Sequence, residues 1–215
     1  MFARYALRGI ASQRASVLAV LLLAALVARA EPPARTLLVM GDSLSAAHGL
    51  AASQGWVALT AERIARVRPG WRVVNASVSG ETTAGGAARI AGELARQKPS
   101  LVVVALGGND GLRGLSLKQT RANLEKLVAA ARAAQARVLL VGIRMPPNFG
   151  KAYTEAFADT FRQVAEAQRV PLLPFLLEPM AQDRSAFQAD GIHPAAAAQP
   201  LLRDHVWTAL SPLLE

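Results

Sequence analysis

Ser43, Asp190 and His193 are the residues whose types and spacing best fit a chemical reaction. Ser43 comes directly after an apolar run that ends at Gly41. A serine hydroxyl is a weak nucleophile that needs a neighbouring base, and the base needs a third group to orient it. His193, one of three histidines, follows Asp190 closely enough for the carboxylate to reach the ring Nδ1–H and leave Nε2 free for the serine proton. Because Asp-Gly-Ile-His-Pro also suits an ordinary turn before a helix, this segment alone supports a catalytic and a structural role equally.

Acyl transfer would also need hydrogen-bond donors for the oxyanion of a tetrahedral intermediate. The candidates are the backbone N–H groups of Ser43 and Gly80 and the side-chain amide of Asn109. A glycine suits such a position because it lets the backbone come close to a substrate. Gly80 could equally be a turn glycine and Asn109 a loop-capping residue. Chance would then have to place the serine, the glycine and the asparagine after three successive apolar runs.

The segments that must position these residues alternate short apolar runs with helical patterns. The runs predicted as strands are 36–40, 71–74, 101–106, 138–143 and 170–173. The helical patterns cover 56–67, 84–97, 117–135, 152–168 and 195–210, with a bend expected at Pro200 in the last. Apolar strands that alternate with helices indicate a parallel sheet covered on both faces. We therefore expect one three-layer α/β/α, flavodoxin-like domain over residues 31–215, with a five-stranded parallel sheet.

Polar and glycine-rich residues follow three of the predicted strands. Asp42-Ser43 follows the first strand, Ser79-Gly80 comes soon after the second, and residues 107–110 follow the third. In open parallel sheets, ligands bind outside the carboxyl ends of the strands, where the strand order reverses. The three loops are therefore predicted to meet at one edge of the sheet and to form an active site there.

Four sequence blocks resemble those of the SGNH, or GDSL-type, hydrolases. They are GDSLS at 41–45, SGET at 79–82, GGND at 107–110 and DGIHP at 190–194. Further likeness at 111–114, 143–150 and 171–175 is to the bacterial periplasmic thioesterases that also act as lysophospholipases and proteases. The likeness runs from about Thr36 to the end of the chain. It implies a Ser43–His193–Asp190 triad, an oxyanion hole from Ser43, Gly80 and Asn109, and hydrolysis of acyl esters and thioesters without a metal or cofactor.

Two positions depart from the thioesterase pattern. Ala47-His48 replaces a Gly-Tyr pair, which places a second histidine near Ser43. His193 remains the expected base because His48 has no carboxylate at a comparable spacing to orient it. His48 is expected to line the cleft or to face solvent. Glu81 replaces an aspartate, a tolerable change that is expected to alter the rim of the cleft. The third histidine, His205, is expected on the surface of the last helix.

Apolar residues in the loops favour a substrate with an acyl chain. We expect an apolar groove that is lined by Leu112, Leu115, Met145, Pro146 and Phe149. Apolar residues can also simply pack loops, so these residues alone do not prove a groove. The expected substrates are lysophospholipids, aryl esters, short-to-medium acyl esters and thioesters. A carbohydrate O-acetyl esterase and a non-catalytic binding module are the alternatives, and an intact triad argues against the second.

The composition excludes several other classes of protein. The chain has no cysteine, which rules out disulfides, a thiol nucleophile, a cysteine-based metal site and a lipid-modified N-terminal cysteine. The motifs G-x-S-x-G, H-E-x-x-H and G-x-x-x-x-G-K-[ST] are absent. The formal charge is +9, and it falls to +5 without the four arginines of residues 1–30. The remaining basic residues are scattered, which argues against nucleic-acid binding and allows transient contact with an anionic membrane surface. We expect a monomer.

Residues 1–30 are typical of a secretory signal peptide. Arg4, Arg8 and Arg14 precede an unbroken apolar run at residues 17–28. This run is too short to span a bilayer, which needs about 20 residues. An Ala-Arg-Ala sequence that ends at Ala30 supplies the small-x-small cleavage pattern. We therefore expect cleavage near this point and a periplasmic or secreted protein, with an uncleaved N-terminal anchor as the alternative.

Overall fold

The computed structural model describes residues 35–215, so the expected signal peptide lies outside the described residues. Five strands form one parallel sheet with the order β2-β1-β3-β4-β5. They are β1 (Arg35–Gly41), β2 (Trp71–Asn75), β3 (Leu101–Ala105), β4 (Arg137–Val141) and β5 (Leu172–Leu173). Because β1 pairs with both β2 and β3, the strand order reverses at β1. The predicted α/β fold with a five-stranded parallel sheet is confirmed.

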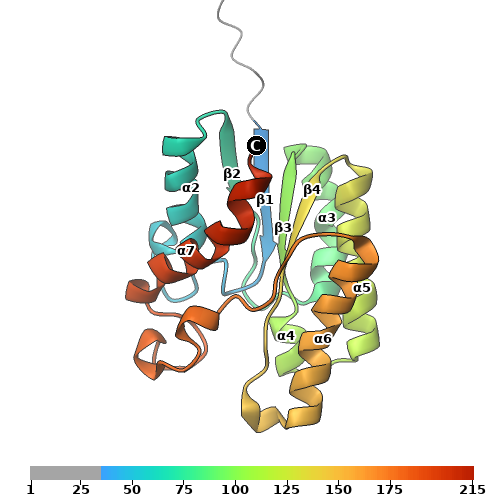
Figure 1. Cartoon of the computed structure of the whole chain (residues 1–215), viewed down its shortest axis with the longest axis vertical. Coiled ribbons are helices and arrows are strands. Elements are labelled where there is room, and N and C mark those ends of the chain that lie inside the picture. Colours follow the sequence, from blue (N-terminus) through green and yellow to red (C-terminus); the bar gives the residue numbers. More distant parts are fainter. Residues whose placement is uncertain (1–34) are drawn as a thin grey trace, which may run out of the picture. The chain divides into compact units, whose positions relative to one another are not determined.

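Helices cover both faces of this sheet and complete the three layers (Figure 1). On one face, α2 (Trp56–Val67) packs against α7 (Gln199–Leu210). On the other face, α3 (Thr83–Gln97), α5 (Leu117–Ala133) and α6 (Lys151–Gln168) lie side by side. Each helix turns its apolar stripe to the sheet, as the helical spacing of its apolar residues predicted. Among residues 35–215, no helix is long and apolar enough to cross a membrane.

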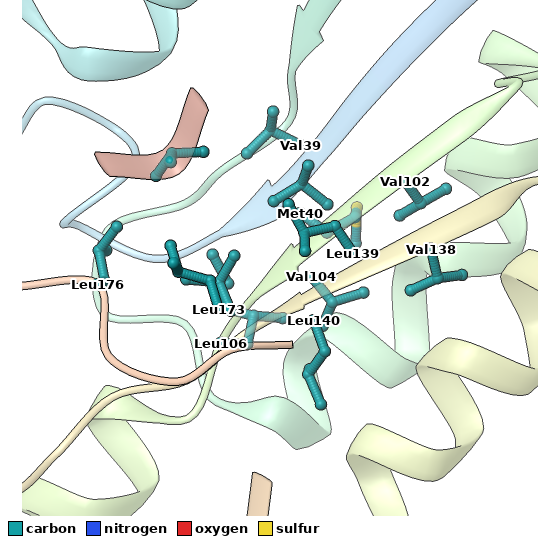
Figure 2. Packing of buried hydrophobic residues seen from close by; sticks show 14 of the residues in the cluster. Val39, Met40, Val102, Val104, Leu106, Val138, Leu139, Leu140, Leu173 and Leu176 are labelled. Atoms are coloured by element: carbon teal, nitrogen blue, oxygen red, sulfur yellow. The ribbon is translucent and has the colours of Figure 1, made fainter. Parts of the chain in front are cut away.

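The central strands are buried along nearly their whole length. Every residue of β3 is buried, and in β1 only Arg35 is exposed. Strands that are covered on both faces have no polar side and therefore read as continuous apolar runs. Figure 2 shows side chains of neighbouring strands packed together, including Val39, Met40, Val102, Val104, Leu139 and Leu140. This close-packed sheet provides a rigid support for the loops at its carboxyl edge.

The ends of several elements differ from the prediction. The last helix, expected over 195–210, begins at Gln199, and a separate 3₁₀ turn covers Ala196–Ala198. Pro200 does not bend this helix but lies in its first turn, where its missing N–H removes no helical hydrogen bond. A short helix, α4 (Gly108–Leu112), was not predicted. It comes directly after β3 and carries one of the candidate oxyanion donors.

Candidate active site

The turn after β1 presents Ser43 at the carboxyl edge of the sheet. At Gly41, a Cβ would lie 2.6 Å from the side chain of Ser45, so the turn requires a glycine. The Asp42 carboxylate accepts a hydrogen bond from the Leu44 N–H at 3.1 Å, and the Asp42 carbonyl accepts one from the Ser45 N–H at 3.1 Å. These bonds on either side of Ser43 fix the backbone that carries its hydroxyl.

A continuous hydrogen-bonded chain joins Ser43, His193 and Asp190. The Ser43 Oγ lies 2.9 Å from Nε2 of His193, and Nδ1 of the same ring lies 2.7 Å from Asp190 Oδ2. The other Asp190 oxygen accepts the backbone N–H groups of Ile192 and His193 at 2.9 and 3.0 Å. The bonds from the His193 N–H, the His193 ring and the Ile192 N–H hold the pKa of the Asp190 carboxyl well below its usual range. An ionised Asp190 keeps a proton on Nδ1, so Nε2 can accept the serine hydroxyl.

Gln188 holds the turn that carries Asp190 and His193. Its backbone N–H donates to the His193 carbonyl at 2.7 Å, and its carbonyl accepts the Gly191 N–H at 2.9 Å. Its side-chain amide donates to the Pro194 carbonyl at 3.2 Å. The turn is thus closed by hydrogen bonds from a residue that the sequence did not single out.

Asn109 reaches the same edge of the sheet from α4. The preceding Gly107 has a φ of 122°, and a Cβ there would lie 2.9 Å from the ring of Phe161. The side-chain amide of Asn109 donates to the Glu81 carbonyl at 3.0 Å and makes a longer contact of 3.4 Å with Asp42 Oδ2. Hydrogen bonds weaken at such lengths. The amide N–H that contacts Asp42 can therefore donate to a substrate oxygen instead, at little cost in free energy.

The two backbone donors expected beside Asn109 are the N–H groups of Ser43 and Gly80. Within residues 35–215, neither N–H is hydrogen-bonded to another protein group. The Gly80 carbonyl instead accepts a hydrogen bond from Arg113 at 3.0 Å, and the next carbonyl is the Glu81 oxygen that bonds to Asn109. The loop that carries Gly80 therefore lies directly against Asn109.

Glu81 lies outside the lining of the cleft. Its side chain is only 7% exposed and accepts two hydrogen bonds from the Arg89 guanidinium, at 2.6 and 2.5 Å. Arg89, in α3, also donates to the Ala76 carbonyl at 2.5 Å. The hydrogen bonds from its guanidinium to Glu81 raise the pKa of Arg89 above its usual value. This Glu81–Arg89 pair anchors the loop between β2 and α3, and that loop carries Gly80.

Asp42 is buried directly beside Ser43. Burial disfavours its charged form and raises its pKa from the usual 3.8 to about 6, although the Leu44 N–H and the nearby His193 favour the charged form. Asp42 and Asp190 are thus two carboxyl groups at one site whose pKa values shift in opposite directions.

A cleft of about 920 Å³ opens over Ser43 and His193. Three of the predicted groove residues, Leu112, Met145 and Pro146, line it. Phe149 does not, because its ring stacks on Tyr153 with centroids 6.1 Å apart. The expected groove residue Leu115 also lies outside the lining. Lining residues that the sequence did not single out include Ile143, Arg144, Phe175, Leu177, Arg184 and Phe187.

The other two histidines do not compete for the role of base. The ring of His48 is exposed and lies 4.4 Å, centroid to centroid, from that of His193, but it does not line the cleft. His205 was expected on the surface, yet it is half-buried, with Nε2 2.9 Å from the Phe175 carbonyl. Over residues 35–215, His193 is the only histidine bonded to a serine hydroxyl and a carboxylate. No group of three His, Asp or Glu side chains in this range could hold a metal ion.

Comparison with known proteins agrees with this architecture. The model of the GDSL-like lipase/acylhydrolase family matches residues 39–200. Esterase TesA of Pseudomonas aeruginosa is 54% identical over 181 residues, which cover 84% of this chain and 90% of that protein. Thioesterase 1/protease 1/lysophospholipase L1 of Escherichia coli is 42% identical over 185 residues, with coverage of 84% and 86%.

Solved structures extend the similarity to the fold. The crystal structure of TesA superposes with a TM-score of 0.81 and covers 83% of this chain and 99% of that chain. The psychrotrophic esterase EstA from Pseudoalteromonas sp., inhibited by monoethylphosphonate, is 37% identical, with a TM-score of 0.80 and coverage of 84% and 98%. The chain therefore belongs to the GDSL-like lipase/acylhydrolase family, the family that its four sequence blocks predicted.

Proposed function

We propose that this protein hydrolyses acyl esters and thioesters through an acyl-enzyme on Ser43, with His193 as general base and Asp190 as its orienting group. The observation that carries the proposal is the hydrogen-bonded chain from Ser43 Oγ through the His193 ring to Asp190, at 2.9 and 2.7 Å. A serine beside a base that a carboxylate orients is the arrangement that activates a hydroxyl for attack on a carbonyl. Membership of an acylhydrolase family, with relatives named esterase and thioesterase, supports the same reaction.

In the first half of the reaction, the acyl group moves to the serine. Ser43 Oγ bonds to the carbonyl carbon while His193 Nε2 takes the hydroxyl proton. The N–H groups of Ser43 and Gly80 and the Asn109 amide donate to the oxyanion, and Asn109 exchanges its long contact with Asp42 for this bond. The imidazolium then gives its proton to the leaving oxygen or sulfur, the bond to the leaving group breaks, and an alcohol or thiol departs.

Water completes the second half of the reaction. His193 Nε2 takes a proton from a water molecule whose oxygen attacks the ester carbonyl of acyl-Ser43. The same three donors stabilise the second oxyanion. When this intermediate collapses, the bond to Ser43 Oγ breaks, the imidazolium returns the proton to Oγ, and a carboxylic acid is released. Asp190 stays ionised throughout and stabilises the positive charge of the imidazolium.

The cleft supports substrates with an apolar acyl chain. Leu112, Ile143, Met145 and Pro146 contribute apolar surface to its lining. Each methylene of a chain that is removed from water there contributes about 0.8 kcal/mol, or roughly a fourfold gain in kcat/KM. Lysophospholipids, aryl esters and short-to-medium acyl esters are therefore the proposed substrates, and thioesters would enter by the same carbonyl chemistry.

The proposed location is the periplasm or the extracellular space. The basic start, short apolar run and Ala-Arg-Ala pattern of residues 1–30 are its support. A mature chain that starts near Glu31 would carry a modest positive charge, which fits transient contact with anionic lipid headgroups. We propose that it acts as a monomer, since one chain supplies the nucleophile, the base and the orienting carboxylate.

A panel of p-nitrophenyl esters from acetyl to palmitoyl tests the proposal, with Ser43→Ala as the control. We expect kcat/KM to rise with chain length from acetyl onward and the control to be inactive on every ester. A marked preference for acetyl esters would favour the carbohydrate esterase alternative. No turnover of any ester or thioester by the wild type would contradict the proposed function.

A further inference from the structure

His48 lies beside the proposed triad, yet no step of the mechanism above uses it. Its ring centroid is 4.4 Å from that of His193, and the two ring planes are inclined by 41°. The His193 side chain is 16% exposed, whereas His48 lies on the surface. His48 therefore covers part of the catalytic imidazole that would otherwise meet solvent.

Backbone hydrogen bonds hold His48 in place from two directions. Its N–H donates to the Ser43 carbonyl at 3.2 Å, and its carbonyl accepts the Gln188 side-chain amide at 2.8 Å. Gln188 also donates its backbone N–H to the His193 carbonyl at 2.7 Å. His48 is thus linked directly to the nucleophile and, through one residue, to the turn that carries the base.

The turn around His48 has an unusual backbone. Ala47 has a φ of 58°, in the left-handed region that residues with a Cβ seldom adopt. Gly49 has a φ of 75°, and a Cβ there would lie 2.2 Å from Gln188 Oε1. Such conformations persist where surrounding contacts enforce them, and they concentrate at functional sites. Here the conformation accompanies a side chain that packs on His193.

We infer that His48 is a positioning residue, which holds the His193 ring in plane with Ser43 and Asp190 and, when protonated, opposes formation of the His193 imidazolium. The inference rests on the proposed role of His193 as base. His193 gains a positive charge when it takes the Ser43 proton. A neutral His48 ring only packs against it, whereas a cationic ring at 4.4 Å repels that charge. This repulsion disfavours the His193 imidazolium in the free enzyme as well as in the transition state, so it changes the pH profile of the reaction.

Other charged groups also face His193. Asp190 bonds to its Nδ1, and the buried Asp42 interacts with it electrostatically. Arg144 and Arg184 line the cleft into which its ring opens. A substitution of His48 leaves these four groups in place. A difference between the pH profiles of wild type and a His48 variant therefore reports on His48.

Two variants separate the packing of His48 from its charge. His48→Phe keeps an aromatic ring but cannot be protonated, whereas His48→Ala removes both properties. Hydrolysis of one p-nitrophenyl ester would be followed from about pH 8 to about pH 5.5, with alkaline quenching before the product is read. Near pH 8, we expect His48→Ala to lower kcat about three- to tenfold with KM within about twofold, because the loss acts on the base. His48→Phe should match the wild type there.

At lower pH the two aromatic enzymes should diverge. The charge of a protonated His48 acts on the wild type alone, so the pH profile of the wild type should depart from that of His48→Phe. The inference would be overturned if His48→Ala had the kcat of the wild type. It would also be overturned if the pH profiles of the wild type and His48→Phe were superimposable. His193→Ala tests the base separately, since a variant that kept its rate would overturn the proposed mechanism whatever the His48 variants do.

Discussion

The two halves of the proposed active site are supported in different ways. Ser43 and Asn109 follow strands of the buried sheet, and close packing around Gly41 and Gly107 fixes their turns. Asp190 and His193 instead lie in a long irregular segment between β5 and α7, where hydrogen bonds rather than a packed core hold the turn. The nucleophile and the oxyanion donors thus depend on the fold of the sheet, whereas the base depends on a local network.

The pKa values of the two aspartates of the site also differ between the two halves. Asp42, in the sheet half, is buried, and desolvation raises its pKa to about 6. Asp190, in the turn half, is partly exposed, and the hydrogen bonds that it accepts lower its pKa. A carboxylate that must stay ionised to orient a base benefits from donors and solvent more than from burial. This comparison explains why the carboxylate that orients His193 comes from the turn and not from Asp42, which is next to Ser43 in the sequence.

The largest expected effect on kcat comes from removing Ser43 or His193, whose hydrogen bond joins the two halves. Ser43→Ala and His193→Ala should each lower kcat by roughly 10⁴- to 10⁶-fold, because nucleophile and base act as one unit. A fluorophosphonate probe should label the wild type once, at Ser43, with labelling read by mass spectrometry. Unchanged labelling in Ser43→Ala would contradict the assignment of the nucleophile.

Within the sheet half, Asn109→Ala should lower kcat by about 10²- to 10³-fold and leave KM within a few-fold, since its amide binds the oxyanion rather than the ground state. The variant also loses the bond to the Glu81 carbonyl, so a thermal melt must accompany the kinetics. Thr60→Ala is a suitable control because Thr60 is buried in α2, where its hydroxyl donates to the Trp56 carbonyl at 2.7 Å, outside the cleft. The control should melt earlier at nearly full rate, and the same behaviour in Asn109→Ala would show that Asn109 only supports its loop.

A smaller effect is expected from the Glu81–Arg89 pair that anchors the Gly80 loop. Glu81→Gln removes the closer of the two carboxylates beside Arg89 and leaves only Glu93, at 3.5 Å. The change should cost about 1–3 kcal/mol of unfolding free energy, less than the loss of a fully buried pair because Arg89 is 26% exposed. We expect kcat to fall about tenfold or less as the loop loosens. Urea unfolding and steady-state kinetics measure the two quantities.

The matched control for this pair lies in α6. Glu166 pairs with Arg162 in an exposed bridge at 2.7 Å. Glu166→Gln should hardly change the free energy of unfolding, because solvent screens an exposed pair, and should leave kcat unaltered. If Glu81→Gln behaved like this control, the pair would have no role in holding the oxyanion loop.

The last expected effect is on the pH dependence of stability. Because the folded pKa of Asp42, about 6, exceeds its usual 3.8, the folded protein binds the Asp42 proton more tightly than the unfolded chain does. Ionisation of Asp42 therefore lowers stability as pH rises from about 4 to above 6, by at most about 3 kcal/mol. Asp42→Asn should remove this dependence, so urea unfolding at pH ~4.5 and ~7.5 should show a larger gain from the substitution at the higher pH. An equal effect at both pH values would contradict the raised pKa.

Asp190 should act in the opposite sense. Since its folded pKa is lowered, its contribution to stability is present above the usual pKa and is lost only as the pH falls towards the folded value. Asp190→Asn should therefore weaken the loss of unfolding free energy at acidic pH. It should leave the pH dependence of unfolding free energy above pH ~5, which comes from Asp42, unchanged. If Asp190→Asn also removed the pH dependence of stability above pH ~5, the two carboxyl groups would not be independent of each other.

Sequence patterns indicated which of the proposed catalytic residues would lie together, because those residues follow local rules. Asp190 and His193 meet through their spacing in one turn, and Ser43 and Asn109 follow apolar runs that form neighbouring parallel strands. The carboxyl ends of such strands lie at one edge of the sheet whatever the details of the side chains. Strand order and loop position were therefore sufficient to bring them together.

Features that depend on packing between distant segments were not predictable. The sequence of α4 contains two glycines and has little helical preference, yet Asp110 holds this helix in place by bonding to the Thr83 N–H at 2.8 Å. Phe149 turns to Tyr153 rather than into the cleft. The contact between His48 and His193 requires a left-handed Ala47, a conformation that no pattern predicts for alanine.

The hydrogen bond between Ser43 and His193 joins residues 150 positions apart in the chain. Contacts of this separation form late, because a long loop must close before they stabilise anything. A chain that is still emerging from a ribosome or a translocation channel can hold β1 and its serine, but not yet the turn that supplies the base. Acyl transfer should therefore begin only when the turn that carries His193 has docked beside Ser43. The recovery of activity during refolding would then mark the final folding step of the domain.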